Sequence, residues 1–126
     1  MVGVAMAVRV LIVDDQPTFR AAARAVVSAA AGFEVVAEVD SGEESLAAVR
    51  EYHPDLVLMD VNLPGIDGMQ ATQMILLPGG GPVVLLLSTR DPEEYAPIAV
   101  ECGASGYISK SDFSPRLLRS MWDATR

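Results

Sequence analysis

The stretch "RVLIVDDQP", residues 9–17, runs from four branched aliphatic residues directly into two adjacent carboxylates. The aliphatic residues 10–13 are too continuous for a strand with one face in water. They predict a central parallel strand that is covered on both sides. Sites in parallel α/β sheets lie beyond the carboxyl ends of the strands. Asp14 and Asp15 are therefore expected at a functional edge of the sheet.

The composition predicts one domain that does not bind nucleic acid by itself. The chain has 126 residues, 51% of them hydrophobic, which is enough to bury a single core. Its formal net charge of -8 excludes DNA binding by this chain alone, because that activity needs clustered Lys and Arg at the phosphates. The single cysteine, Cys102, cannot form an internal disulfide, which fits a reducing compartment.

The N-terminal stretch "MVGVAMAVRVLIV" is apolar enough to suggest export. It lacks a basic n-region, is too short to span a bilayer and is interrupted by Arg9. We therefore expect residues 1–7 to be a leader or remnant and residues 8–126 to form one domain. The protein is expected to be cytoplasmic, without contact with a membrane.

Strand and helix patterns alternate along the chain. Apolar residues recur at helical spacing from Phe19 to Ala30 and stop at Gly32. Further strands are expected at residues 34–39, 55–60, 83–88 and 106–109, and further helices at 41–54, 69–77, 91–103 and from 114. Ser41 and Glu44 predict a capping box on the second helix, and Pro97 predicts a fourth helix that is kinked or begins late. Five such units imply an α/β fold with a doubly wound, five-stranded parallel sheet.

Polar residues end four of the predicted strands: Asp14 and Asp15, then Asp60, Ser88 and Lys110. All of them are expected at one edge of the sheet. Two unit charges about 4 Å apart repel by about 4 kcal/mol at an effective dielectric of about 20, so the acids need compensation. An all-oxygen site suits Mg²⁺ or Mn²⁺. A metal beside an ammonium and a hydroxyl makes a pocket for a transferable phosphoryl group.

The motifs "LIVDDQP", "LVLMDVNLPGIDG", "LLLSTRD" and "GASGYISKS", in this order, resemble the receiver domain of two-component response regulators over residues 8–124. The stretch "GASGYISK" is most similar to the subfamily with a C-terminal helix-turn-helix output domain. The resemblance implies a flavodoxin-like (βα)5 fold and a phosphorylation-dependent switch that is not a conventional enzyme. It also implies a sensor histidine kinase as partner, self-association as one use of the switch, and DNA contact only through an output domain absent from this chain.

The resemblance also implies roles for the acidic residues. Asp60 is expected to be the residue phosphorylated by the kinase, with Mg²⁺ or Mn²⁺ present. Asp15 and Asp60 would bind the metal directly, and the backbone carbonyl of Asn62 would be a third ligand. Asp14 would act mainly through metal-bound water.

Three further residues would read the phosphoryl group. Lys110 would pair with it, Ser88 would move to hydrogen-bond it, and Tyr107 would turn inward as the switch aromatic. These movements would reshape the surface formed by the fourth helix, fifth strand and fifth helix, and so control an output such as transcription. Ser111 follows Lys110 where many relatives have proline, so that conformational constraint is absent.

Structural alternatives exist for several of these residues. One of the two adjacent aspartates could cap the first helix, Ser88 could be a local cap, and Tyr107 could be a half-buried packing residue. A phosphohydrolase with an aspartyl nucleophile is disfavoured because Asn62 occupies the position of its usual acid. A phosphorylation-independent, receiver-like adaptor remains the alternative function.

Overall fold

The computed structural model describes residues 6–125, apart from the side chains of Pro92 and Tyr95. Strands and helices alternate in this part of the chain. The strands are β1 (Val8–Val13), β2 (Phe33–Val39), β3 (Leu56–Asp60), β4 (Val83–Ser88) and β5 (Gly106–Ser109). The helices are α1 (Pro17–Ala29), α2 (Gly42–Tyr52), α3 (Gly68–Leu76), α4 (Pro92–Cys102), the short 3-10 helix η1 (Lys110–Asp112) and α5 (Pro115–Ala124).

The leader expected over residues 1–7 falls mostly outside the described residues, since residues 1–5 are not among them. The first strand begins at Val8. None of the helices between residues 6 and 125 has the length and apolar composition needed to cross a bilayer.

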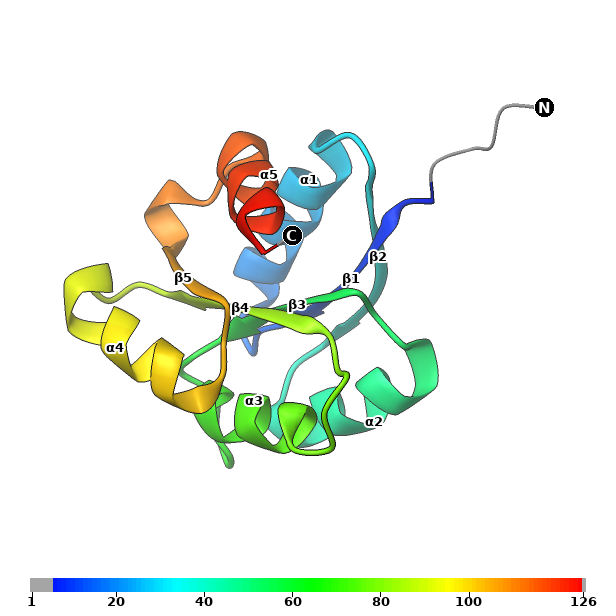
Figure 1. The fold of residues 1–126 in the computed structure, drawn as a ribbon. Helices are drawn as coiled ribbons and strands as arrows, with labels where there is room; N and C mark the ends of the chain where they lie inside the picture. Colours follow the sequence, from blue (N-terminus) through cyan, green and yellow to red (C-terminus); the bar gives the residue numbers. More distant parts are fainter. Residues whose placement is uncertain (1–5, 126) are drawn as a thin grey trace.

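All five strands are parallel and lie in the order β2-β1-β3-β4-β5 (Figure 1). This order is the flavodoxin-like one, so the predicted doubly wound α/β fold is confirmed. The strand order reverses between β1 and β3, and in such sheets ligands bind beyond the carboxyl ends of the strands at this point. The residues that follow β1 and β3 therefore lie where sheets of this kind bind their ligands.

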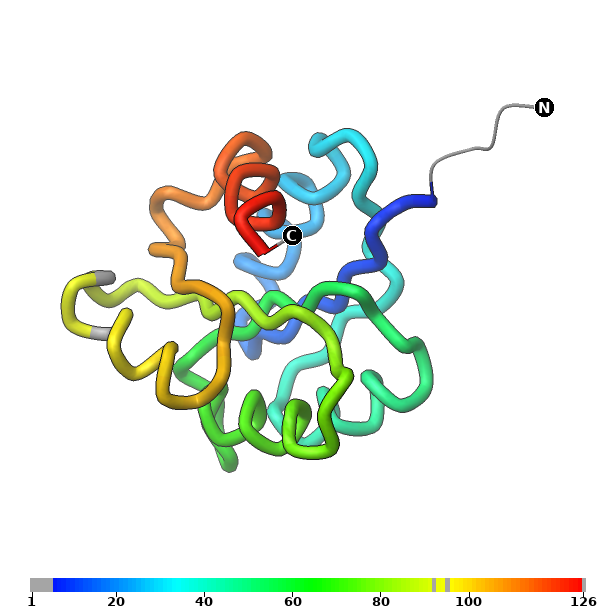
Figure 2. Tube along the Cα trace, in the orientation of Figure 1, coloured from blue at the N-terminus to red at the C-terminus, as the bar shows by residue number. Residues whose placement is uncertain are grey.

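The sheet is covered on both faces, as the continuous aliphatic runs predict. Helices α1 and α5, far apart in sequence, lie side by side on one face, and α2, α3 and α4 cover the other (Figures 1 and 2). Alternate residues of each strand serve the two layers, since successive side chains point to opposite faces. Val10 and Ile12 pack toward α1 and α5, whereas Leu11 and Val13 pack toward α2.

The helix starts follow from capping side chains, with one correction to the prediction. Ser41 caps α2 by accepting the Glu44 N–H at 3.1 Å. The Glu44 carboxylate accepts the N–H of Asp40, not that of Ser41, so the predicted capping box is incomplete. The complete box lies on α3, where Asp67 and Gln70 each accept the other's backbone N–H, at 2.8 and 3.0 Å.

Helix α4 begins directly after its cap, Asp91, and contains Pro97. The expected late start is therefore wrong. A proline removes the N–H that would bond the carbonyl four residues earlier, here that of Glu93. Both Glu93 and Pro97 are exposed, so water can bond the carbonyl that the proline leaves without a helical partner.

The turn after β3 brings the first residue of α3, Gly68, back against the end of β3. The N–H of Gly68 donates to the carbonyl of Val61 at 3.0 Å, and Gly68 itself is buried. A Cβ at this position would collide with the backbone carbonyl of Asp60. Only glycine allows α3 to begin this close to Asp60, and the turn thereby fixes the end of β3.

Candidate functional site

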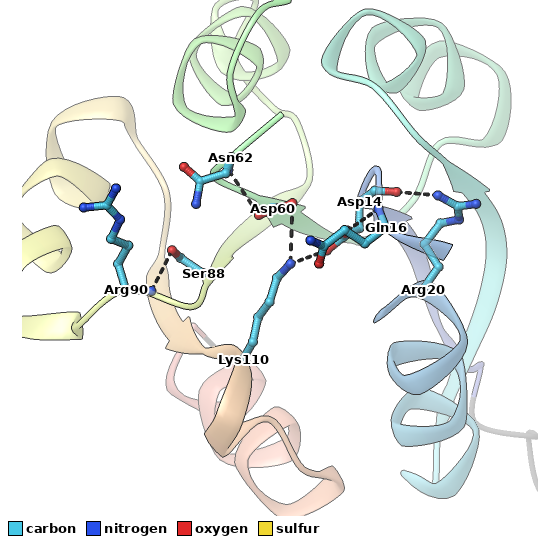
Figure 3. A network of polar contacts seen from close by, with 8 residues as sticks. All are labelled: Asp14, Gln16, Arg20, Asp60, Asn62, Ser88, Arg90 and Lys110. Atoms are coloured by element: carbon cyan, nitrogen blue, oxygen red, sulfur yellow. Dashed lines mark hydrogen bonds and ion pairs between the residues drawn. The ribbon is translucent and has the colours of Figure 1, made fainter. Parts of the chain in front are cut away.

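The predicted polar residues meet at one edge of the sheet, and the chain topology brings them there. Asp14 follows β1, Asp60 ends β3, Ser88 ends β4 and Lys110 begins the short helix after β5. Because β1, β3, β4 and β5 are consecutive neighbours in a parallel sheet, their carboxyl ends lie together. Lys110 extends from the end of β5 toward Asp60 and Asp14 (Figure 3).

Three carboxylates form the centre of this site. Asp14, Asp15 and Asp60 each offer one oxygen, and these oxygens all lie within 4.8 Å of one another. Asp14 and Asp60 are buried, with 1% and 2% of their surface exposed, whereas Asp15 is exposed. The site is therefore open to solvent on the Asp15 side.

Burial, and then the charge of Asp14, raise the pKa of Asp60 from 3.8 to about 6. The Lys110 ammonium and the hydrogen bond from the Asn62 N–H oppose this rise. Asp60 is therefore mostly ionised at neutral pH, but burial and repulsion from Asp14 destabilise its negative charge. A cation bound beside it would relieve that repulsion.

Lys110 supplies one positive charge inside this cluster. Its Nζ lies 2.7 Å from Asp14 Oδ2 and 3.5 Å from Asp60 Oδ2, and 9% of its side chain is exposed. One ammonium faces three carboxylates, so the group as a whole remains negative.

Asp14 is held by contacts that sequence reasoning did not identify. Its Oδ1 accepts the Gln16 N–H at 2.8 Å, and its backbone carbonyl accepts a hydrogen bond from Arg20 at 2.7 Å (Figure 3). Its Oδ2 forms an ion pair with the Lys110 ammonium at 2.7 Å and has no hydrogen-bond partner within residues 6–125. Helix α1 has no side-chain cap, so the capping alternative for the two aspartates is wrong.

Ser88 and Tyr107 are joined through the backbone of Arg90. The Arg90 N–H donates to Ser88 Oγ at 3.0 Å, and the Tyr107 hydroxyl donates to the Arg90 carbonyl at 3.1 Å. Ser88 is fully buried and Tyr107 is half-buried. The Ser88 contact is a local turn bond, as the structural alternative expected, but it also ties the end of β4 to the aromatic ring on β5.

A hollow elsewhere on the molecule contains none of the predicted site residues. It has a volume of about 380 Å³ and is bordered by His53, Asp55, Pro82 and Trp122. Asp55 precedes β3 and Pro82 precedes β4, so this hollow lies at the amino ends of the strands. The carboxylates, the ammonium and the switch residues all lie at the opposite, carboxyl edge, which therefore remains the candidate site.

Comparison with known proteins agrees with this geometry. The model of the response regulator receiver domain matches residues 10–122. The chain is 33% identical over 114 residues to the transcriptional regulatory protein DegU of Brevibacillus brevis, covering 90% of this chain and 48% of that protein. It is 35% identical over 118 residues to the chemotaxis protein CheY of Halobacterium salinarum, covering 94% of this chain and 97% of that protein.

A solved structure shows the same fold. The signal receiver domain of the response regulator NarL from Mycobacterium tuberculosis superposes with a TM-score of 0.85 at 30% identity, covering 94% of this chain and 96% of that one. The chain spans about half the length of the first curated relatives that it matches. The family match over most of the sequence, the relatives above 30% identity and the shared fold together show that this chain belongs to the response regulator receiver domain family.

Proposed function

We propose that this chain is a phosphorylation-dependent signalling switch in which Asp60 accepts a phosphoryl group from a sensor histidine kinase. The observation that carries the proposal is the buried Asp60 carboxylate, 3.5 Å from the Lys110 ammonium and grouped with Asp14 and Asp15 at the sheet edge. A core aspartate without a chemical role would rarely be surrounded by two further acids.

The proposed transfer uses Asp60 as nucleophile. One carboxylate oxygen attacks phosphorus, and a P–O bond forms as the P–N bond to the kinase histidine breaks. The imidazole nitrogen keeps the bonding electron pair and takes a proton from solvent. Lys110, whose Nζ already lies beside Asp60 Oδ2, is placed to neutralise negative charge on the transferred group.

The donor set fits a hard divalent cation. It consists of carboxylate oxygens from three acids, and within residues 6–125 the buried Asp14 Oδ2 is satisfied only by its ion pair with Lys110. We assign Asp15, Asp60 and the Asn62 carbonyl to hold Mg²⁺ or Mn²⁺, with Asp14 acting through metal-bound water. The bound cation would supply charge neutralisation for the phosphoryl oxygens.

The response to phosphorylation would start at Ser88. A phosphoryl group adds a charge of about -1.5 to -2 near neutral pH. If the Ser88 hydroxyl turns toward it, the bond from the Arg90 N–H is lost, and the Arg90 carbonyl that holds Tyr107 shifts with it. The surface of α4, β5 and α5 would then change shape and bind a partner or a second copy. A transcriptional output is the use that the name of the DegU relative suggests.

Mass spectrometry after incubation with acetyl phosphate and Mg²⁺ tests the acceptor. We expect one added phosphoryl group on the wild type and on Asp123→Asn, an exposed control acid on α5, and none on Asp60→Asn. Wild-type labelling of Asp60→Asn would overturn the assignment. An unlabelled wild type would favour the phosphorylation-independent adaptor.

Hydrogen exchange tests the switch surface. With beryllofluoride as a phosphoryl mimic, we expect the largest change in protection between residues 90 and 111, the segment that contains α4 and β5. A change confined to α1 and α2 would show that the proposed surface is wrong.

A further inference from the structure

The aromatic ring of Phe19, on α1, contacts the ammonium of Lys110. The Nζ atom lies 4.3 Å from the centre of the Phe19 ring. The ring face of phenylalanine carries partial negative charge, so it attracts a cation at this distance, and more strongly where water is excluded. With 9% of its side chain exposed, Lys110 is largely shielded from water.

The Phe19 ring is itself held in place. Phe113, which follows η1, packs against it with ring centres 6.5 Å apart and planes inclined by 36°. Both rings pack against the core layer between the sheet and the helices α1 and α5. The ring therefore cannot turn away without disturbing this layer.

The ammonium needs such a support because its neighbours do not define one position. Three carboxylates lie close together, and the four-carbon stem of lysine is flexible. In the structure Nζ is 0.8 Å closer to Asp14 than to Asp60, at 2.7 against 3.5 Å. A ring on one side restricts Nζ to positions from which it reaches both acids.

We propose that Phe19 is a positioning residue: its ring face holds the Lys110 ammonium between Asp14 and the phosphoryl group that arrives on Asp60. This inference rests on the proposed phosphoryl transfer for its consequence, but the contact itself exists without it. A ring that served only as core packing could be replaced by another apolar side chain without effect on Lys110.

Lys110 is the only lysine among the 126 residues, so NMR of a labelled lysine tests the contact with Phe19 directly. Protein labelled with ¹³C-lysine therefore gives a single set of lysine signals. Ring currents shift protons above an aromatic face upfield, so we expect the Lys110 Hε signals of the wild type upfield of their position in the unfolded chain. Phe19→Leu should abolish this shift and Phe19→Tyr should retain it.

The second readout is the rate of Asp60 phosphorylation by acetyl phosphate with saturating Mg²⁺. Phe19→Leu should lower the maximal rate constant by between about threefold and about thirtyfold, the range that corresponds to a cation–ring contact. The donor concentration at half-maximal rate should change less, and Phe19→Tyr should restore the rate.

Phe33→Leu is the matched control. Phe33 also lies beneath a cation, with the Arg119 guanidinium 4.8 Å from its ring centre, and it belongs to the same core layer. It starts β2 and pairs with Val8, at the amino edge of the sheet, so it lies far from Lys110. This variant should leave both the lysine signals and the rate unchanged.

The outcomes separate the two proposals. If the wild type is not phosphorylated, the proposed function is wrong. The lysine signals would still show whether the Phe19 ring contacts Lys110. A Phe19→Leu protein that is folded, with lysine signals and rate equal to those of the wild type, overturns the positioning role. Equal rate losses in Phe19→Leu and Phe33→Leu would also overturn it, because the effect would then be one of general packing.

Discussion

Replacing Asp60 with asparagine should stabilise the fold in metal-free buffer, and the gain should grow with pH. Burial and the Asp14 charge raise the pKa of Asp60 to about 6 in the native state, against 3.8 when unperturbed. The native chain therefore ionises less readily than the unfolded chain, so stability falls as pH rises from about 3.8 through about 6. Asparagine cannot ionise and avoids this loss.

The magnitude follows from the two pKa values. Their difference predicts that Asp60→Asn raises the free energy of unfolding by about 3 kcal/mol at about pH 7.5. The gain should be about half of that at about pH 5 and well under 1 kcal/mol at about pH 4. The pairing with Lys110 needs no separate deduction, because the attraction of Lys110 is already included in the pKa of about 6. In the variant Lys110 keeps Asp14 at 2.7 Å, and the asparagine carbonyl can still accept the Asn62 N–H.

Urea unfolding in the presence of EDTA measures the effect at these pH values. Asp123→Asn makes the same chemical change at an exposed position and should alter stability by no more than about 0.5 kcal/mol. A gain in Asp60→Asn that did not depend on pH, or a loss of stability at neutral pH, would show that the Asp60 carboxylate is not destabilised in the native state. The pH dependence is decisive, since better packing alone would not titrate.

Three further predictions concern the metal, a cap and the core. Mg²⁺ should raise the melting temperature of the wild type, since a ligand bound only by the native state stabilises it, and Asp15→Ala should remove most of this rise; an equal rise in the variant would place the metal elsewhere. Asp67→Ala should lower the free energy of urea unfolding by about 1 kcal/mol through loss of the α3 capping box, and Asp67→Asn by much less; equal losses would mean that the cap contributes nothing. Leu118→Ala should lower the same free energy by about 2 to 5 kcal/mol, because Leu118 is fully buried between α5 and the sheet; a loss below 1 kcal/mol would show that this layer repacks.

The strands were the most predictable part of the fold. Because both faces of the sheet are buried, each strand appears in the sequence as an apolar run, and the observed bounds of β3, β4 and β5 lie within one residue of the predicted ones. The polar residues that end these runs were predictable for the same reason, since parallel strands bring their ends together. Helix ends were harder, and α1 stops at Ala29, before the predicted boundary at Gly32.

Contacts between distant segments were not predictable. Helical spacing placed Phe19 on the core face of α1, but only the fold brings its ring beneath Lys110. Arg20 and its bond to the Asp14 carbonyl leave no local pattern either. The short helix that begins at Lys110 was missed because three residues are too few for a periodic signal.

The glycine that opens α3 limits how this site can evolve. Any side chain at position 68 would displace the backbone of Asp60, so a substitution there would alter the proposed acceptor without touching a charged group. In a library of all single variants selected for phosphoryl uptake, position 68 should tolerate almost nothing, while Gln73, which is exposed on the same helix, should accept many residues.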